Sequence, residues 1–255
     1  MKNLFDLSGK VALVTGASSG LGVQFAKVLA ENGADIAILA RREDRLKAVK
    51  DEIEAIGVKC HYVVCDVLDV KQIEDAVKDV EEHYGKIDIL VNNAGFAIGG
   101  PSEDISNEDW KKIVDINLNA PFFFAREVGK GMIKRGYGKI INIGSIHSEV
   151  ARLDVAVTGY ATTKGGIKML TKSLAVDWAK KGITVNAIGP GYFPSEMTEA
   201  GLSDPNVQLW LDAYSPMGRT GRDGELNGAL LLFASDASSH INGQLLLVDG
   251  GWTAI

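Results

Sequence analysis

The sequence predicts a doubly wound α/β fold, with a seven-stranded, mainly parallel sheet covered by helices on both faces. Seven short runs carry this prediction, because each is nearly continuous in apolar and β-branched residues, as strands buried on both faces are. The runs are Val11–Thr15, Ile36–Leu39, Tyr62–Cys65, Ile87–Asn92, Ile140–Ile143, Ile183–Ile188 and Leu245–Val248. Longer amphipathic stretches separate them, and this alternation indicates right-handed strand–helix–strand units. In one such stretch, a helical face is formed by Ile73, Ala76, Val77, Val80 and Tyr84.

The composition is that of an ordinary globular chain of 255 residues, which we expect to form one domain spanning residues 1–255. The net charge of −6 argues against a nucleic-acid-binding surface, which needs a basic face. The sequence has neither an apolar run of membrane-spanning length nor a signal-peptide core at its start, so we expect a cytoplasmic protein. Cys60 and Cys65 are expected to be buried free thiols, and no His/Cys cluster suggests a metal site.

A long proline-rich stretch follows the sixth run. Residues 189–216 contain Pro190, Pro194, Pro205 and Pro216. Loops this long usually cover a binding site, and α/β folds bind ligands at the carboxyl ends of their strands. We therefore expect a substrate lid at about 189–216, with a merely irregular connection as the alternative.

A glycine-rich turn, TGASSGLG, links the first strand to the first helix. Gly16 permits a tight turn, Gly20 lets the backbone approach a pyrophosphate, and Gly22 lets the helix pack close to the sheet. Free N–H groups at the start of a helix attract an anion. The turn therefore predicts a Rossmann-type dinucleotide site, which also includes Ser18, Ser19 and Leu21.

A second group of residues has the properties needed for proton transfer to an alkoxide, the product of hydride addition to a ketone. Tyr160 and Lys164 are four residues apart and share a helical face. A nearby ammonium favours the phenolate and lowers the pKa of a tyrosine. Ser145 ends the fifth strand, and Asn117 lies on the preceding helix.

The chain resembles the short-chain dehydrogenase/reductase family, in its single-domain branch, on TGASSGLG, on the NNAG motif at Asn92–Gly95, and on the ordered set Asn117, Ser145, Tyr160 and Lys164. The resemblance implies that Tyr160 donates or accepts the proton and that the Ser145 hydroxyl positions the carbonyl. It also implies that Lys164 binds the nicotinamide ribose and lowers the tyrosine pKa, and that Asn117 holds a water of the proton relay.

The interval from Ser145 to Tyr160 is fifteen residues, longer than the family usually has, and Ser148 is a rival for the serine role. We favour Ser145 because it stands where the strand run ends. The extra residues then fall in a loop at 147–158 that should border the substrate. His147 and Tyr192 are the further substrate candidates, and Arg152 is a weaker one for gripping an acidic group.

The resemblance also implies cofactor contacts beyond the glycine turn. The implied set is Asp66 against adenine with Val67 beside it, Asn93, Ala94 and Gly95, and Pro190, Gly191 and Ser195 of a PGxxxT-like segment. The second strand run is followed by Ala40, where NAD-using relatives have an acid, and Arg41 comes next. A guanidinium can bind a 2′-phosphate through two hydrogen bonds, so we expect NADP(H), with Arg41 as the main contact and Arg42 as a weaker one.

Together these features predict an NADP(H)-dependent alcohol dehydrogenase/carbonyl reductase of the short-chain type, acting on a secondary alcohol and its ketone. The segments 141–149 and 191–198 resemble the gluconate 5-dehydrogenase branch, which favours a sugar acid or polyol. The absence of a basic residue at 96–100 favours a more apolar pocket instead. A 3-oxoacyl-ACP reductase, a hydroxysteroid dehydrogenase and a non-catalytic NADP(H)-binding sensor are the alternatives. The apolar segment Leu245–Val248, with Trp252 and Ile255, and the family resemblance favour a homotetramer.

Overall fold

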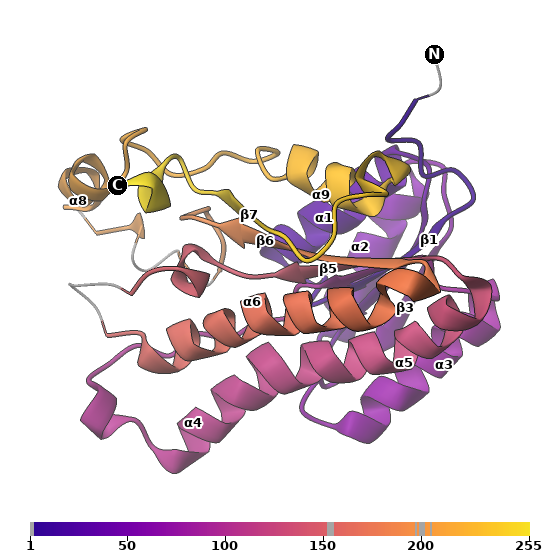
Figure 1. Cartoon of the computed structure of the whole chain (residues 1–255), viewed down its shortest axis with the longest axis horizontal. Coiled ribbons are helices and arrows are strands. Elements are labelled where there is room, and N and C mark those ends of the chain that lie inside the picture. The colour runs from indigo at the N-terminus through magenta and orange to yellow at the C-terminus, as the bar shows by residue number, and fades with distance from the viewer. Residues whose placement is uncertain (1–2, 152–155, 197, 199–201, 205) are drawn as a thin grey trace.

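The computed structural model describes residues 3–151, 156–196, 198, 202–204 and 206–255. Its strands are β1 (Val11–Thr15), β2 (Asp35–Ala40), β3 (Cys60–Val64), β4 (Ile89–Asn92), β5 (Gly138–Ile143), β6 (Ile183–Pro190) and β7 (Leu245–Val248). They form one sheet in the order β3-β2-β1-β4-β5-β6-β7, and every neighbouring pair is parallel. The predicted fold class is therefore confirmed, and the sheet is parallel throughout (Figure 1).

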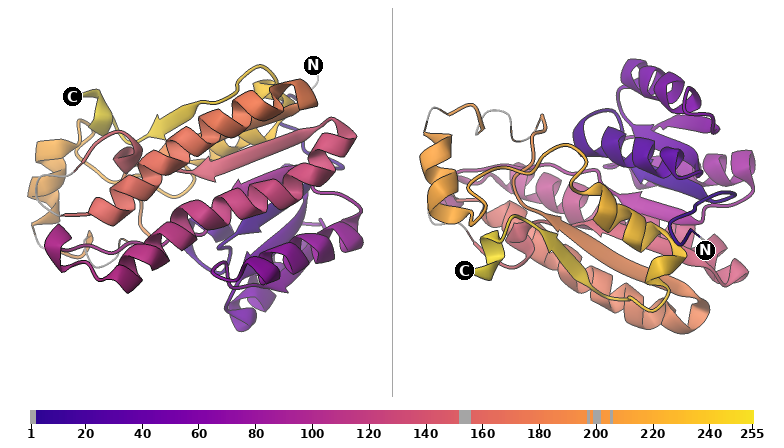
Figure 2. Two further views of the ribbon diagram at one scale, coloured as in Figure 1. Left: turned by 60° about the horizontal axis from the view of Figure 1, so that its bottom comes forward. Right: turned by 90° about the horizontal axis from the view of Figure 1, so that it is seen from above.

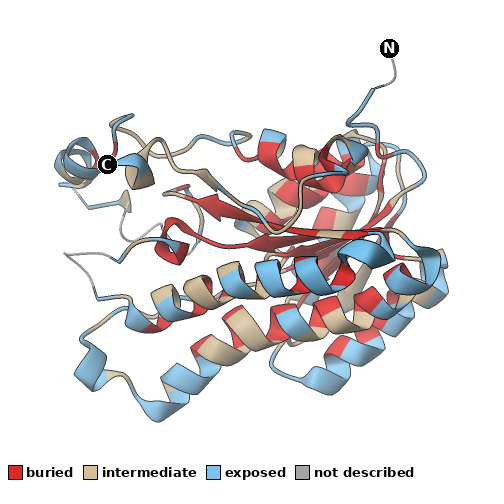
Figure 3. Ribbon diagram, viewed as in Figure 1, coloured by how far each residue is buried: buried red, intermediate tan, exposed pale blue. Residues whose placement is uncertain are grey.

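Helices cover both faces of the sheet (Figures 1 and 2). One face carries α1 (Gly20–Glu31), α2 (Glu43–Glu54) and α9 (Asn227–Ala234); the other carries α3 (Val70–Tyr84), α5 (Ala120–Arg135) and α6 (Thr158–Trp178). The shorter helices are α4 (Asn107–Val114) and α8 (Val207–Tyr214), and short turns lie at Ser102–Asp104, Ile146–Ser148, Ala179–Lys181, Asp236–Ser238 and Trp252–Ala254. Figure 3 shows the central strands buried and the outer helix faces exposed, as a three-layer packing requires.

The two faces of the sheet have separate apolar cores. On the face of α1, Phe25 and Leu29 pack with Val14 and Ile36. On the face of α5, the core includes Phe124, which is 1% exposed. These cores explain why the strand runs are apolar without alternation. Cys60 and Cys65 are buried free thiols, as predicted, and burial raises the pKa of each to about 12.

Helix α3 shows how local sequence sets the element boundaries. The Asp69 carboxylate accepts hydrogen bonds from the backbone N–H groups of Lys71 and Gln72, which caps the start of the helix. Gly85 ends the helix in the left-handed conformation, with φ of 78°. The predicted apolar face is confirmed, since Ile73 and Val77 are buried.

The strand order reverses between β1 and β4, because the chain first adds strands on one side of β1 and then on the other. In open α/β sheets, this switch point opens a crevice at the carboxyl ends of the strands. Strand β1 ends at Thr15 and β4 at Asn92, so the glycine turn and the segment after β4 begin side by side.

The stretch at 189–216, predicted as a long loop that forms a substrate lid, contains regular secondary structure. Strand β6 continues to Pro190, and α8 forms inside the stretch. Aromatic rings hold α8 against the C-terminal segment: the Trp252 ring centroid lies 4.8 Å from that of Trp210 and 5.6 Å from that of Tyr214. Residues 197, 199–201 and 205 of this stretch lie outside the described residues. A lid role for it stays a prediction. Among the helices described, none combines the length and the apolar character of a membrane span.

Candidate active site

A cleft of about 470 Å³ opens at the carboxyl ends of the strands. Most of the predicted site residues line it. Those that do are Gly16, Ser18, Ser19, Gly20, Leu21, Arg41, Arg42, Asp66, Val67, Asn93, Ala94, Gly95, Ser145, Tyr160, Lys164, Pro190, Gly191 and Ser195. Four predicted residues, Gly22, Asn117, His147 and Tyr192, are not part of this lining.

The glycine turn leaves space that only hydrogen can fill. Gly16 has φ of 67°, and a Cβ there would lie 2.8 Å from the Cα of Ala94. A Cβ on Gly22 would lie 2.3 Å from the carbonyl oxygen of Gly16. Helix α1 begins at Gly20, and the Ser19 hydroxyl bonds Arg42 and Glu196 instead of capping the helix. The turn thus presents the start of a helix to the cleft, which fits the pyrophosphate of a dinucleotide.

The segment after β4 is fixed against this turn. The Asn93 amide donates to the carbonyl oxygens of Thr15 and Gly16 at 3.0 and 3.3 Å. The Thr15 hydroxyl accepts from the backbone N–H groups of Asn93 and Ala94 at 3.0 and 3.1 Å. These bonds bring the two motifs together on one wall of the cleft. At the rim, the Asp66 carboxylate accepts from the N–H of Leu68 at 3.1 Å.

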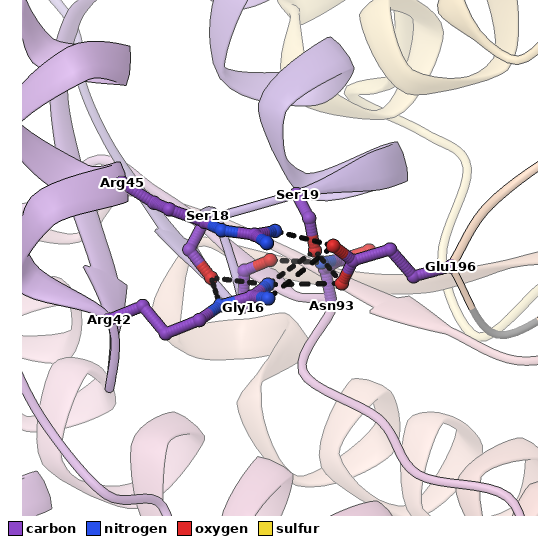
Figure 4. A network of polar contacts seen from close by, with 7 residues as sticks. All are labelled: Gly16, Ser18, Ser19, Arg42, Arg45, Asn93 and Glu196. Atoms are coloured by element: carbon purple, nitrogen blue, oxygen red, sulfur yellow. Dashed lines mark hydrogen bonds and ion pairs between the residues drawn. The ribbon is translucent and has the colours of Figure 1, made fainter.

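Arg42, rather than Arg41, reaches the glycine turn (Figure 4). Its Nη2 donates to the hydroxyls of Ser18 and Ser19 at 3.1 and 2.8 Å. Arg42 has an extended backbone immediately before α2, and its side chain turns back over the turn. Arg41 lines the same cleft and is exposed. The geometry therefore favours Arg42 as the main anion contact, the reverse of the order expected from the sequence.

The two candidate serines have different surroundings. Ser145 lines the cleft, its hydroxyl bonds Tyr160, and it also accepts from the N–H of His147 at 3.1 Å. The Ser148 hydroxyl instead accepts from the backbone N–H of Ser145 at 3.3 Å, which closes the short turn after β5. The arrangement supports Ser145 as the group that meets a substrate and Ser148 as its structural support.

Tyr160 and Lys164 stand one helical turn apart at the start of α6. The Lys164 Nζ is buried, donates to the carbonyl oxygen of Ile143 at 2.7 Å, and lies 5.5 Å from the centroid of the Tyr160 ring. The α6 helix thus places an ammonium beside a phenol, with the end of β5 holding the ammonium in place.

Burial dominates the pKa values of this pair. It raises the pKa of Tyr160 to about 12, while the hydrogen bond from Ser145 acts in the opposite direction. Burial also lowers the pKa of Lys164 to about 8. The expected net lowering of the tyrosine pKa is therefore not seen, because the low-dielectric surroundings disfavour both charged forms. Near neutral pH the dominant pair is the ammonium and the neutral phenol.

Asn117 lies in a π-helical turn, Asp115–Asn119, between α4 and α5. Its side chain donates to the carbonyl oxygen of Phe96 at 2.7 Å and accepts from the N–H of the same residue at 2.8 Å. It also donates to the Thr163 hydroxyl at 3.2 Å. Asn117 thus connects the segment after β4 to α6, beside the tyrosine. Such π-turns are frequent at functional sites.

His147 and Tyr192 form a polar pair beside Tyr160. His147 is buried, its Nδ1 lies 3.0 Å from the carbonyl oxygen of Val150, and its Nε2 lies 3.5 Å from the Tyr192 hydroxyl. A carbonyl only accepts, so Nδ1 donates a proton to the Val150 oxygen. The His147 ring meets the Tyr160 ring edge-on, with centroids 6.0 Å apart. His147 is thus a buried, hydrogen-bonded residue and not a solvated histidine of the loop.

The sequence reasoning missed three residues with charged or hydroxyl side chains that line the cleft: Lys112, Glu196 and Thr198. The Lys112 Nζ lies over the Phe96 ring, 4.7 Å from its centroid. Residues 96–100, directly after NNAG, include no basic residue, but α4 brings Lys112 to this segment. A search for basic residues on the helix preceding Asn117 could have found it. Arg152 lies outside the described residues. Among those described, no cluster of His, Cys, Asp or Glu could hold a metal ion.

Known proteins resemble this chain over almost its full length. The family model described as enoyl-(acyl carrier protein) reductase matches residues 16–253. The gluconate 5-dehydrogenase of Gluconobacter oxydans is 45% identical, over 98% of this chain and 97% of that protein. The 5-keto-D-gluconate 5-reductase of Escherichia coli is 38% identical, over 98% of each chain.

A solved structure agrees with this likeness. The gluconate 5-dehydrogenase of Burkholderia cenocepacia, in complex with NADP and tartrate, superimposes with a TM-score of 0.95 at 41% identity, over 99% of this chain and 98% of that one. The matched region contains the glycine turn, the NNAG segment and the serine–tyrosine–lysine set described above. The chain therefore belongs to the short-chain dehydrogenase/reductase family.

Proposed function

We propose that the protein is an NADP(H)-dependent oxidoreductase that interconverts the C5 hydroxyl of a gluconate-like sugar acid and the corresponding ketone. One observation carries the proposal: a single cleft joins the glycine turn and Arg42 to Ser145, Tyr160 and Lys164. The relatives named for gluconate 5-dehydrogenase and 5-keto-D-gluconate 5-reductase support the substrate class.

The side chains provide the proton chemistry of such a reaction. The bound nicotinamide would supply the hydride to the ketone carbon, or take it from the alcohol. In reduction, the Tyr160 phenol donates its proton to the carbonyl oxygen as negative charge develops there, and the Ser145 hydroxyl stabilises that oxygen with a hydrogen bond. In oxidation, the Tyr160 phenolate accepts the hydroxyl proton. The Lys164 ammonium balances the phenolate charge and can also bond the ribose hydroxyls.

Cofactor choice follows from the end of β2. Ala40 offers no carboxylate to repel a 2′-phosphate, and Arg42 offers a guanidinium supported by Ser18 and Ser19. We expect NADP⁺ to give a kcat/KM with D-gluconate about ten- to a hundredfold above that of NAD⁺, the factor that one charge-assisted contact provides. A preference for NAD⁺ would refute the proposed cofactor. Activity on 3-oxoacyl thioesters in place of gluconate would refute the proposed substrate.

Lys112 is the proposed contact for the substrate carboxylate. Of the other basic residues in the lining, Arg41 and Arg42 follow β2 and Lys164 is buried beside Tyr160. Lys112 remains, and its Nζ lies over the Phe96 ring. Lys112→Gln should lower kcat/KM for D-gluconate about tenfold or more and change that for the uncharged polyol galactitol less than about threefold. Lys111→Gln, on the neighbouring and exposed position of α4, is the matched control. An equal loss on both substrates would assign Lys112 a structural role.

The pH profile should follow the Tyr160–Lys164 pair. The base form is a phenolate beside an ammonium, and its population rises tenfold per pH unit until Lys164 deprotonates at a pKa of about 8. Above that pH the loss of one proton is shared between the two groups, so the population stays constant. Hence kcat/KM for oxidation should rise up to about pH 8 and then stay constant. The kcat/KM for reduction should not depend on pH below pH 8. A steady rise of oxidation through pH 10 would contradict this coupling.

We also propose a homotetramer, supported by apolar side chains left exposed on the edge strand and on α6. Leu246 of β7 is 37% exposed, Met169 and Val176 of α6 are 61% and 81% exposed, and Ile255 is 85% exposed. Light scattering that gives a monomer mass at micromolar concentration would refute it. A cytoplasmic location stays a prediction.

A further inference from the structure

Glu196 reaches across the outer end of the cleft, from the segment after β6 to the glycine turn and α2 (Figure 4). Its Oε2 accepts from the Ser19 hydroxyl at 2.9 Å and from the Arg42 Nη2 at 3.1 Å. Its Oε1 accepts from the Arg42 Nη1 at 3.4 Å and pairs with Arg45. A carboxylate thus sits among two guanidinium groups and a hydroxyl.

These groups form a site for an anion. The same Arg42 Nη2 that bonds Glu196 also donates to the hydroxyls of Ser18 and Ser19. Phosphate and carboxylate present similar oxygens to a guanidinium, and both can accept two parallel hydrogen bonds from it. The arginines hold the pKa of Glu196 near 2, so the carboxylate stays charged at every working pH. The site is therefore filled by an anion from the chain itself.

We propose that Glu196 is a cofactor-specificity residue: its carboxylate occupies the subsite of Arg42, Ser18 and Ser19 that the 2′-phosphate of NADP(H) would take. The proposal rests on the proposed use of NADP(H). Binding of the phosphate requires Glu196 to release Arg42, and the two negative groups also repel each other. NAD(H) has a hydroxyl at this position and requires no such exchange. Glu196 therefore weakens the binding of NADP(H) selectively and narrows the preference that Arg42 creates.

Glu196→Gln tests this exchange, because it removes the charge and keeps the size of the side chain. The dissociation constant of NADPH, measured by calorimetry without substrate, should fall about three- to tenfold, and that of NADH should change less than about twofold, as expected for exposed ion pairs. In an Arg42→Ala background the same substitution should lose most of this effect, because the shared partner is gone.

Glu43→Gln is the matched control. Glu43 directly follows Arg42, but its carboxylate pairs with Lys47 at 2.9 Å and accepts from the Tyr62 hydroxyl at 3.2 Å. The substitution removes the same charge close to the same cleft. It should leave the ratio of NADPH to NADH affinity unchanged. This result would separate competition for Arg42 from a general change in the electrostatic potential of the cleft.

Three results would overturn the proposal. An unchanged NADPH affinity in Glu196→Gln would show that the carboxylate does not compete with the phosphate. A weaker NADPH affinity would show that Glu196 closes over the bound cofactor. An equal gain in Glu43→Gln would show a general charge effect. A wild type that prefers NADH would refute the proposed cofactor, yet the shift in the ratio on Glu196→Gln would still decide the role of Glu196.

Discussion

Tyr160→Phe should lower kcat about a hundred- to ten-thousandfold, the range expected when a general acid–base group is removed. The substitution deletes only the hydroxyl oxygen, so the ring keeps its place beside the His147 ring. The hydrogen bond with Ser145 is lost, and so is the proton that the phenol would donate. Steady-state kinetics with saturating NADPH and ketone measure the effect.

NADPH binding provides the control for this substitution. The glycine turn and Arg42 lie at the other end of the cleft, so the dissociation constant of NADPH should stay within about twofold of wild type, as expected for distant, independent sites. A variant that keeps most of its kcat would show that Tyr160 is not the proton donor. A variant that loses NADPH binding together with kcat would show that the residue supports the cofactor instead.

Ser145→Ala should lower kcat about a hundred- to a thousandfold, because a donor that stabilises a developing oxyanion contributes that much. Ser145 lines the cleft and bonds Tyr160, so its removal affects both the substrate oxygen and the orientation of the phenol. The NADPH affinity should again change little. Single-turnover reduction separates this loss in chemistry from any change in product release.

Ser148→Ala is the matched control, since Ser148 has the same side chain in the same turn. Its hydroxyl bonds the backbone N–H of Ser145, so its loss should lower the free energy of unfolding by about 1 kcal/mol. Its kcat should fall less than about tenfold, because only the position of Ser145 is affected. The opposite ranking of the two alanine variants would move the serine role to Ser148.

The features of the fold and site that depend on the order of elements along the chain could be predicted from the sequence. Continuous apolar runs identify buried parallel strands, and a parallel sheet brings every strand end to one edge. The residues that follow β1, β4 and β5 therefore had to meet, and Gly16, Asn93 and Ser145 line one cleft. Tyr160 and Lys164 are one helical turn apart, so their proximity could be predicted from their spacing alone.

The parts that depend on tertiary packing could not be predicted. The backbone dihedrals after β2 decide whether the side chain of Arg41 or that of Arg42 contacts the glycine turn. Lys112 and Glu196 line the cleft although both are far from the glycine turn in the sequence. The prolines of residues 189–216 predicted a loop without a helix, yet α8 forms there. Its aromatic contacts with the C-terminal segment stabilise it.

The direction of the tyrosine pKa shift also lay beyond the sequence. The spacing of Tyr160 and Lys164 shows that an ammonium is near, which favours the phenolate. Burial acts on both groups in the opposite sense, because it raises the pKa of Tyr160 and lowers that of Lys164. The extent of burial follows from the packing of α6 against the sheet, which no local pattern encodes.

The most direct test of the central claim follows the hydride itself. The enzyme is incubated with 5-keto-D-gluconate and NADPH that is doubly deuterated at C4 of the nicotinamide, and the product is examined by NMR. The account predicts gluconate with one deuterium on C5, while the new hydroxyl proton comes through Tyr160 from solvent. A product without deuterium at C5, or no reduction of this ketone by an enzyme that binds NADPH, would contradict it.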